Sequence, residues 1–190
     1  MGSTPQARRG DTRARIQDVA LSLFAEQGYE KTSLREIAEH LQVTKAALYY
    51  HFKTKEDLVI SIFDDRSKPF DELIEWGGKQ PRTLETKQEL LRRYSALLAD
   101  AGPLFRFIQE NQATMRELSI GESFKVRLFS LFDLIKEPDA PLGDQVRCIS
   151  ALFTIHAGTF ALKDIEGDLK DKQKAVLEVA LELVTSAHHA

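Results

Sequence analysis

"TSLREIAEHLQVTKAALYYHF", residues 32–52, is the stretch that decides the fold of this chain. Ser33, followed three residues later by Glu36, has the pattern of a capping box, which predicts that a helix begins after Ser33. Thr44 is placed to cap a second short helix. Because only about three residues join the two helices, the helices must cross steeply, as they do in a helix-turn-helix.

The apolar residues of this stretch predict which side chains face inward. Ile37, Ala38 and Leu41 share one face of the first helix, and Leu48 and Phe52 stand at i,i+4 on the second. The small side chain of Ala38 lets the two helices approach closely where they cross. The side chains that are then turned outward are Lys45, Ala46, Tyr49, Tyr50 and Lys53.

This outward set has the chemistry of a DNA-contacting surface. A lysine ammonium can reach phosphate or guanine, and a small alanine permits close approach to the duplex. Phenols donate hydrogen bonds to phosphate oxygens and stack against sugars or thymine methyl groups. The alternative is a solvated helix face whose two tyrosines pack on neighbouring side chains. The pattern favours DNA binding over that alternative.

Charge is distributed unevenly along the 190 residues, whose net charge is −3. Residues 1–55 carry nine Lys/Arg and six Asp/Glu (+3), and residues 56–190 carry seventeen and twenty-three (−6). A basic DNA-facing end on an acidic body has this distribution. The composition, 43% hydrophobic and 29% charged, is that of an ordinary globular protein of one or two domains.

The single cysteine, Cys148, excludes an internal disulfide and fits a reducing compartment. The longest stretch without formal charge in the second half, residues 148–162, has 15 residues, whereas a membrane-spanning helix needs about 20. No signal peptide is visible at the N-terminus. We therefore expect a cytoplasmic protein with no membrane association.

The periodicity of the whole chain predicts an all-α protein of about nine helices. Gly28 is a natural end for the first helix, Pro69 marks a break, and "GGKQP" (77–81) is the clearest loop. The first ten residues and the "AHHA" end are expected to lack order. The predicted helices run over 12–27, 34–40, 45–52, 54–66, 83–100, 103–118, 121–136, 141–164 and 168–187.

The segment 20–59 resembles the DNA-binding domain of TetR-family transcriptional regulators, through the pieces "LFAEQGY", "TSLREIA", "LYYHF" and the K-x-K-E-D-L that follows. The resemblance implies a DNA-binding domain over 11–55, after a tail of residues 1–10, and an effector-binding and dimerisation domain over 56–190. One position departs from the family, which usually has glycine in the turn where this chain has Gln42. A left-handed backbone there would cost glutamine roughly 1 kcal/mol relative to glycine.

The family's DNA-contacting positions can be carried over residue by residue. Arg35 matches a position that reaches a base edge, although an ion pair with Glu39 is the alternative. His51 matches a phosphate-contacting position, although a hydrogen bond within the domain is the alternative. The DNA contacts implied by the resemblance are Thr32, Ser33, Arg35, Thr44, Lys45, Ala46, Tyr49, Tyr50, His51 and Lys55.

The two last predicted helices suggest a homodimer. The segment 146–162 is apolar nearly all round, so we expect one face in the chain's own core and another against a partner. The resemblance agrees, since the family dimerises through its final two helices, and a dimer places two recognition helices about 34–36 Å apart on a palindromic operator. The alternative is a wholly intramolecular core. The predicted interface residues are Leu152, Ile155, Gly158, Thr159, Val176, Ala180, Leu183 and Val184.

Ten of the sixteen aromatic residues lie between Phe70 and Phe160, in the region where the family encloses a small-molecule pocket. Aromatic walls with few polar groups suit such a pocket. The alternative is that these aromatic residues only fill the core. The predicted pocket residues are Trp76, Tyr94, Arg106, Phe107, Asn111, Phe129, Phe153 and His156.

No pattern in the chain favours an enzyme. Cys148 has no evident base, His40 alone makes no metal site, and there is no glycine-rich phosphate loop, so we expect neither catalysis nor a cofactor nor a metal. The chain is interpreted as a DNA-binding transcriptional regulator, a repressor that leaves its operator when a small hydrophobic or aromatic effector binds. The alternative is a DNA-binding or chromosome-organising protein of the same fold that has no effector.

Overall fold

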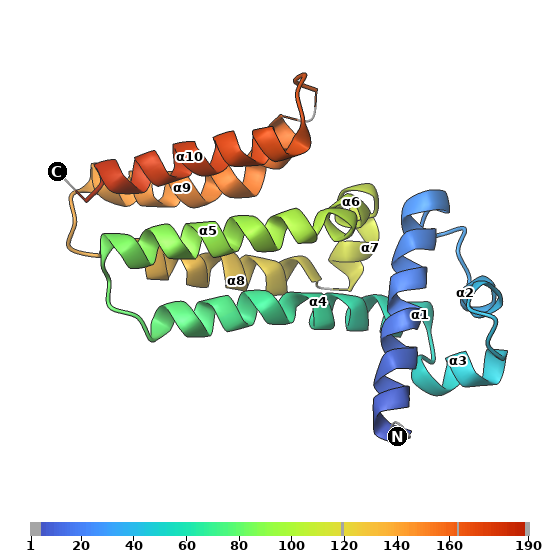
Figure 1. The fold of residues 1–190 in the computed structure, drawn as a ribbon. Coiled ribbons are helices and arrows are strands. Elements are labelled where there is room, and N and C mark those ends of the chain that lie inside the picture. The colour runs from blue at the N-terminus through green and yellow to red at the C-terminus, as the bar shows by residue number, and fades with distance from the viewer. Residues whose placement is uncertain (1–4, 119, 163, 189–190) are drawn as a thin grey trace. The chain divides into compact units, whose positions relative to one another are not determined.

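The computed structural model describes residues 5–118, 120–162 and 164–188, with the side chains of residues 5–11, 103, 105, 106, 109, 159 and 160 left aside. The described residues form ten helices and no strand (Figure 1). The helices are α1 (Pro5–Gln27), α2 (Leu34–His40), α3 (Lys45–His51), α4 (Lys55–Gly78), α5 (Leu84–Asp100), α6 (Gly102–Glu110), α7 (Gln112–Glu117), α8 (Ile120–Ile135), α9 (Leu142–Ala161) and α10 (Leu169–Ser186).

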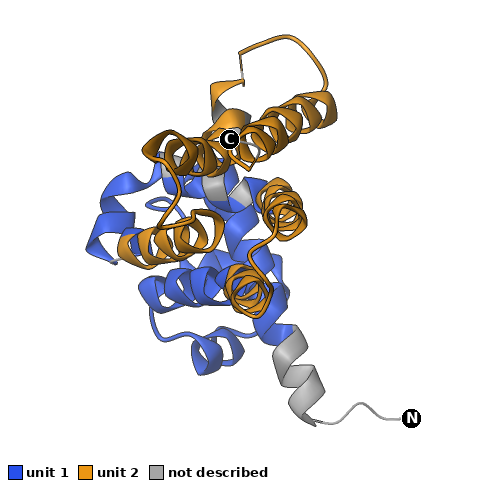
Figure 2. Cartoon of the chain, turned by 90° about the vertical axis from the view of Figure 1, so that its left-hand side faces the viewer, with its two compact units in different colours: residues 1–67, 101–121 blue, residues 68–100, 122–190 orange. Residues whose placement is uncertain are grey.

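The chain divides into two compact units (Figure 2). The first comprises residues 1–67 and 101–121, and the second comprises residues 68–100 and 122–190. The first unit therefore contains, besides α1–α3, the beginning of α4 and the whole of α6 and α7, which lie beyond the expected boundary at residue 55.

Aromatic stacking explains why α6 belongs to the first unit. The ring of Phe107 lies 5.2 Å from that of Phe24 on α1, and 6.1 Å from that of Tyr29 in the turn after α1. Phe63 on α4 contacts the same ring at 6.2 Å. Leu104 is also buried in this cluster. Burial of so large an apolar surface favours keeping α6 with the helix-turn-helix.

The short helices begin and end as the sequence predicts. The Ser33 hydroxyl accepts from the backbone N–H of Glu36, and the Glu36 carboxylate accepts from the Ser33 N–H at 2.7 Å. Thr54 and Asp57 form the same reciprocal pair at the start of α4. Gly28, at φ +89°, ends α1 in the left-handed region that favours glycine.

Two predicted helix boundaries were wrong. The helix expected to end near residue 66 continues through Pro69 to Gly78, so α4 has a proline inside it. A proline inside a helix removes one backbone hydrogen bond, and Pro69 is exposed, so its ring needs no space in the core. The helix expected over 103–118 is divided at Asn111 into α6 and α7. In addition, α1 begins at Pro5, so residues 5–10 are helical rather than an irregular tail.

In the second unit α9 and α10 pack side by side, and both contact α5 (Figure 1). Gly158 allows the close approach of α9 to α10, because a Cβ added there would lie 2.6 Å from Cγ2 of Val176. Among the described residues, no helix is long and apolar enough to cross a membrane.

Candidate DNA-binding site

The second helix of the helix-turn-helix, α3, has one buried face and one exposed face. Leu48 and Phe52 are 0% and 2% exposed, and Ala38 on α2 is 3% exposed, so the predicted core of the motif is confirmed. Lys45 and Ala46 are exposed on the first turn of α3, and Tyr50 is 63% exposed one turn later. These three side chains form the outward surface that we call the α3 ridge.

Tyr49 contributes less to this surface than the sequence suggested. Its side chain is half-buried and packs against the hydrophobic core of the first unit. The ammonium of Lys45 lies 5.5 Å from the centre of the Tyr49 ring, within the range of a cation–π contact. Tyr49 therefore supports Lys45 from beneath, and Tyr50 is the phenol that faces outward.

The turn between α2 and α3 has the left-handed backbone expected at Gln42, whose φ is +55°. The N–H of Val43 donates to the carbonyl of Ala38, and the N–H of Gln42 donates to that of Glu39. These two bonds define a Schellman motif, in which the residue after the C-cap adopts the left-handed conformation. Gln42 thus occupies a glycine position without being glycine, and it fixes the angle at which α3 leaves α2.

Thr32 is buried and does not form part of an outward surface. It is 1% exposed, and its hydroxyl donates to the carbonyl of Gly28 at 2.8 Å and accepts from Nε2 of Gln27. The sequence places Thr32 where free N–H groups suit a phosphate, but in the structure its N–H donates to the Tyr29 carbonyl at 3.2 Å and its side chain closes the end of α1. Ser33 is exposed, but its N–H is held by Glu36 and its hydroxyl serves the capping box. These hydrogen bonds hold the pKa of Glu36 below its usual value, so a carboxylate stands where a phosphate was expected.

Lys55 also has a partner within the first unit. Its ammonium donates to the carbonyl of Tyr29 at 2.7 Å and lies 3.9 Å from the centre of the Tyr29 ring. The Tyr29 hydroxyl in turn donates to Glu56 at 3.1 Å, and burial is the main reason why its pKa is raised. Lys55 therefore ties the start of α4 to the turn after α1. No local sequence pattern indicates this contact, since the two residues are 26 positions apart.

The remaining predicted contacts lie at the surface of the motif. Thr44 is exposed and caps α3 by accepting from the Ala47 N–H at 3.2 Å. Arg35 forms the ion pair with Glu39 that was the alternative to a DNA contact, at 2.7 Å. Both side chains are exposed, and an exposed ion pair contributes little to stability, so Arg35 can leave Glu39 for another anionic partner. The His51 ring is half-buried and meets the Tyr50 ring edge-on at 5.4 Å.

The family model described as bacterial regulatory proteins, tetR family, matches residues 16–62. The HTH-type transcriptional regulator AcrR of Shigella flexneri is 46% identical over 72 residues, which cover 37% of this chain and 34% of that protein. The chain belongs to the TetR family. The fatty acid metabolism regulator protein of Bacillus subtilis is 33% identical over 87 residues, 45% of each chain. This TetR-family chain therefore matches about a third to a half of the length of these curated relatives.

Solved structures resemble the TetR-family chain over nearly its whole length. A transcriptional regulator from Aquifex aeolicus has a TM-score of 0.70 at 22% identity, covering 91% of this chain and 99% of that one. A TetR/AcrR-family regulator from Thermobifida fusca has a TM-score of 0.61 at 25% identity, covering 90% and 97%. The all-α fold with an N-terminal helix-turn-helix is thus the fold of the family. Members of this family are non-enzymatic transcription factors.

In the second unit, the predicted pocket residues of this TetR-family chain do not form one group. Tyr94 and His156 do meet, since the Tyr94 hydroxyl lies 2.8 Å from Nδ1 of His156. Burial raises the pKa of Tyr94 and lowers that of His156, which favours a phenol donating to a neutral imidazole. Phe70 and Phe124 pack around this pair, with Phe70 6.1 Å from Tyr94 and Phe124 6.0 Å from His156.

The other predicted pocket residues lie elsewhere. Phe107 is in the core of the first unit, and Asn111 donates its side-chain amide to the Phe107 carbonyl at 2.9 Å. Phe129 and Phe153 are 54% and 47% exposed, and each contacts the buried Phe132 between them. The side chain of Arg106 lies outside the described part of the structure. Trp76 lies in a groove between α4 and α5.

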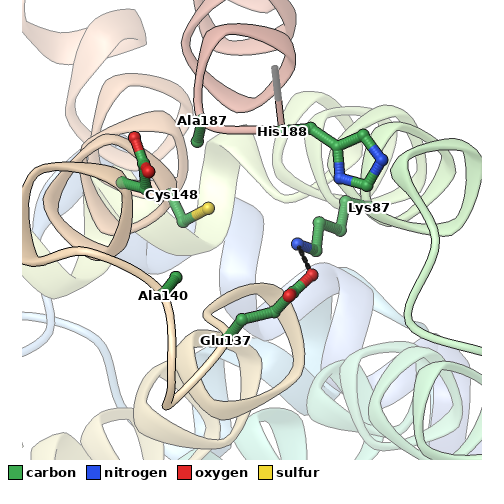
Figure 3. Close-up of a pocket in the computed structure, with 7 residues that line it drawn as sticks. Lys87, Glu137, Ala140, Cys148, Ala187 and His188 are labelled. Atoms are coloured by element: carbon green, nitrogen blue, oxygen red, sulfur yellow. Dashed lines mark hydrogen bonds and ion pairs between the residues drawn. The ribbon is translucent and has the colours of Figure 1, made fainter. Parts of the chain in front are cut away.

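A polar cavity of about 180 Å³ also lies within the second unit (Figure 3). Buried Lys87 forms an ion pair with Glu137 at its wall, and this pair keeps the pKa of Glu137 below its usual range. The rest of the lining consists of Ala140, Asp144, Cys148, Ala187 and His188. Burial raises the pKa of the Cys148 thiol, which disfavours the reactive thiolate. This cavity is polar, so it is unsuited to the hydrophobic effector that the sequence suggested.

Most of the predicted dimer residues are covered by the chain itself. Leu152 and Ile155 on α9 and Val176, Ala180 and Val184 on α10 are each at most 7% exposed, because the two helices pack on one another. Gly158 serves the same contact and Leu183 is half-buried, whereas the Thr159 side chain lies outside the described part. Other faces of the same helices carry exposed apolar side chains, among them Val146, Phe153 and Val179, which are each about half exposed, at 52%, 47% and 48%.

Proposed function

We propose that this TetR-family protein is a transcriptional regulator that binds specific double-stranded DNA through the α3 ridge. The observation that carries the proposal is the division of α3 into a buried face with Leu48 and an exposed face with Lys45, Ala46 and Tyr50. The Lys45 ammonium can donate to a guanine edge or a phosphate, and the Tyr50 hydroxyl can donate to a phosphate oxygen of the DNA backbone. The AcrR of Shigella flexneri, which is 46% identical to this chain over 72 residues, is named a transcriptional regulator.

The proposal includes a homodimer on a palindromic operator. One helix-turn-helix reads only a few base pairs, and two of them in a symmetric dimer read half-sites about 34–36 Å apart. Three exposed apolar side chains, Val146 and Phe153 on α9 and Val179 on α10, supply the surface for a second copy. In this proposal the interface is still formed by α9 and α10, but by these exposed side chains and not by the buried residues expected from the sequence.

The proposal also includes release from DNA by a small hydrophobic or aromatic effector bound to the second unit, which makes the protein a repressor. The related Bacillus subtilis protein is named a fatty acid metabolism regulator, and a TetR-fold regulator FadR from the same species was solved in complex with stearoyl-CoA. Release follows if the effector prefers a conformation that does not bind DNA, and DNA affinity falls by no more than that preference. The second candidate is a DNA-binding protein of the same fold without an effector, which the polar character of the 180 Å³ cavity favours.

The proposed function is tested by selecting bound sequences from a random pool of duplex DNA and measuring the affinity of the protein for the selected sequences. Wild-type protein is expected to enrich a palindrome and to bind it more weakly as salt increases. Lys45→Ala should lose affinity, whereas Lys174→Ala, an exposed lysine of the second unit, should not. Failure of the wild-type protein to enrich any sequence at low ionic strength would contradict the proposal.

A further inference from the structure

A groove of about 300 Å³ lies on the second unit between α4 and α5, which run side by side (Figure 1). Pro69 stands at one end of its α4 wall and Trp76, seven residues later, at the other. At the helical rise of 1.5 Å per residue, these two positions are about 10 Å apart along α4. The residues between and opposite them are Glu72, Leu73, Ala96, Leu97 and Arg93.

One end of the groove carries a stacked pair of aromatic and cationic groups. The guanidinium carbon of Arg93 lies 4.0 Å from the centre of the Trp76 ring. Glu89 accepts a hydrogen bond from Nε of Arg93 at 2.8 Å. Within the described residues, the two terminal nitrogens of this guanidinium have no other hydrogen-bond partner. A guanidinium fixed in this way presents its edge for a two-point contact with a carboxylate.

The rest of the groove is apolar except at its rim. Leu73 is buried at the floor, and Leu97 and Ala96 form the α5 wall. Glu72 is exposed near the middle of the α4 side, where its carboxylate disfavours an anionic group. A ligand that carries a carboxylate is thereby oriented, with its charged head at Arg93 and its apolar body directed toward Pro69.

We propose that this groove binds a small lipophilic carboxylate with an apolar body about 10 Å long. This inference rests on the proposed function, because it identifies the groove as the effector site of the regulator. Helix α4 continues from the groove into the first unit, and the boundary between the units falls at residues 67 and 68. Pro69 has no backbone N–H to donate beside that boundary, so a ligand packed on Pro69 contacts a turn of α4 that lacks one intrahelical hydrogen bond.

The proposal can be tested with octanoate, because Trp76 is the only tryptophan of the chain and its fluorescence reports on the groove. Titration of the full chain with octanoate should give a saturable change, and octanol and octylamine should bind at least about tenfold more weakly, since they lack the carboxylate. Arg93→Gln should weaken octanoate binding by a similar factor. Arg92→Gln is the matched control, because it removes a neighbouring arginine outside the groove and should leave binding unchanged.

Filling the groove provides a second test. Ala96→Phe should abolish octanoate binding, measured by calorimetry so that the result does not depend on the Trp76 signal. Octanoate should also weaken DNA binding by the wild-type protein and not by Ala96→Phe. The inference is overturned if octanoate does not bind, if Arg93→Gln and Ala96→Phe bind it as the wild type does, or if bound octanoate leaves DNA affinity unchanged. Since DNA binding without octanoate is measured in parallel, failure of the groove is distinguished from failure of DNA binding.

Discussion

The most instructive perturbation is Gln42→Gly in the turn of the helix-turn-helix. Gln42 adopts φ +55° within a Schellman motif, and its side chain is exposed. A left-handed backbone costs an L-residue about 1–2 kcal/mol. Glycine removes this cost. It also raises the conformational entropy of the unfolded chain, which lowers the free energy of unfolding by about 0.4–1 kcal/mol. The net expected effect is an increase of about 0.5–1 kcal/mol in the free energy of unfolding.

Gln42→Ala is the matched control, because alanine lacks the glutamine side chain but keeps the Cβ that makes the left-handed backbone unfavourable. The melting temperature of Gln42→Gly should exceed that of Gln42→Ala by about 1–4 °C, given about 2–4 °C per kcal/mol for a chain of this size. Urea denaturation should show a higher midpoint with an unchanged slope. If the glycine variant were no more stable than the alanine variant, the strain assigned to this turn would be absent.

Three further substitutions probe the second unit. Phe153→Glu places a charge on the exposed face of α9 and should convert a homodimer into monomers in sedimentation experiments; an unchanged dimer would show that this face is not the interface. Gly158→Ala forces a Cβ to 2.6 Å from Val176 and should lower the free energy of unfolding by about 1–3 kcal/mol, whereas an unchanged melting temperature would mean that α9 and α10 separate easily. Burial lowers the pKa of His156, so its contribution to stability is present above the unfolded pKa of about 6.5 and is lost as the pH falls through the lower folded value. His156→Gln should therefore flatten the decline of melting temperature below pH 6.5, and an unaltered decline would point to other groups.

The sequence predicts the helix-turn-helix well because its determinants are local. Ser33 and Glu36 are three residues apart, and Leu48 and Phe52 are four apart, so capping and burial can be inferred without knowledge of distant segments. The left-handed conformation of Gln42 is likewise a property of the turn itself.

The sequence predicts less well where distant segments decide the outcome. Lys55 binds the carbonyl of Tyr29, and Phe107 joins the core of the first unit, through contacts that no local pattern reveals. The apolar α9 has two apolar faces, and periodicity alone does not say which face packs on α10. Leu152 and Phe153 are adjacent in sequence, yet the first is buried and the second is 47% exposed.

Polar or aromatic side chains among apolar neighbours indicate a pocket, but residues of a packed core show the same pattern. Tyr94 and His156 show it because they hydrogen-bond to each other in the interior of the second unit. Trp76 shows it because Arg93 stacks on its ring beside a groove. The arrangement of α4 and α5 decides whether such a residue lies in the interior, as Tyr94 does, or beside a groove, as Trp76 does. That arrangement depends on the packing of the whole unit.

The central claim, that the α3 ridge reads DNA, is tested most directly by comparing the sequences selected by wild-type protein and by Lys45→Ala. Loss of a base-contacting lysine should cost about 1–3 kcal/mol on the preferred sequence and relax the preference at one base pair of each half-site. The other positions of the operator should be selected as before. An unchanged preference at every position would contradict the claim.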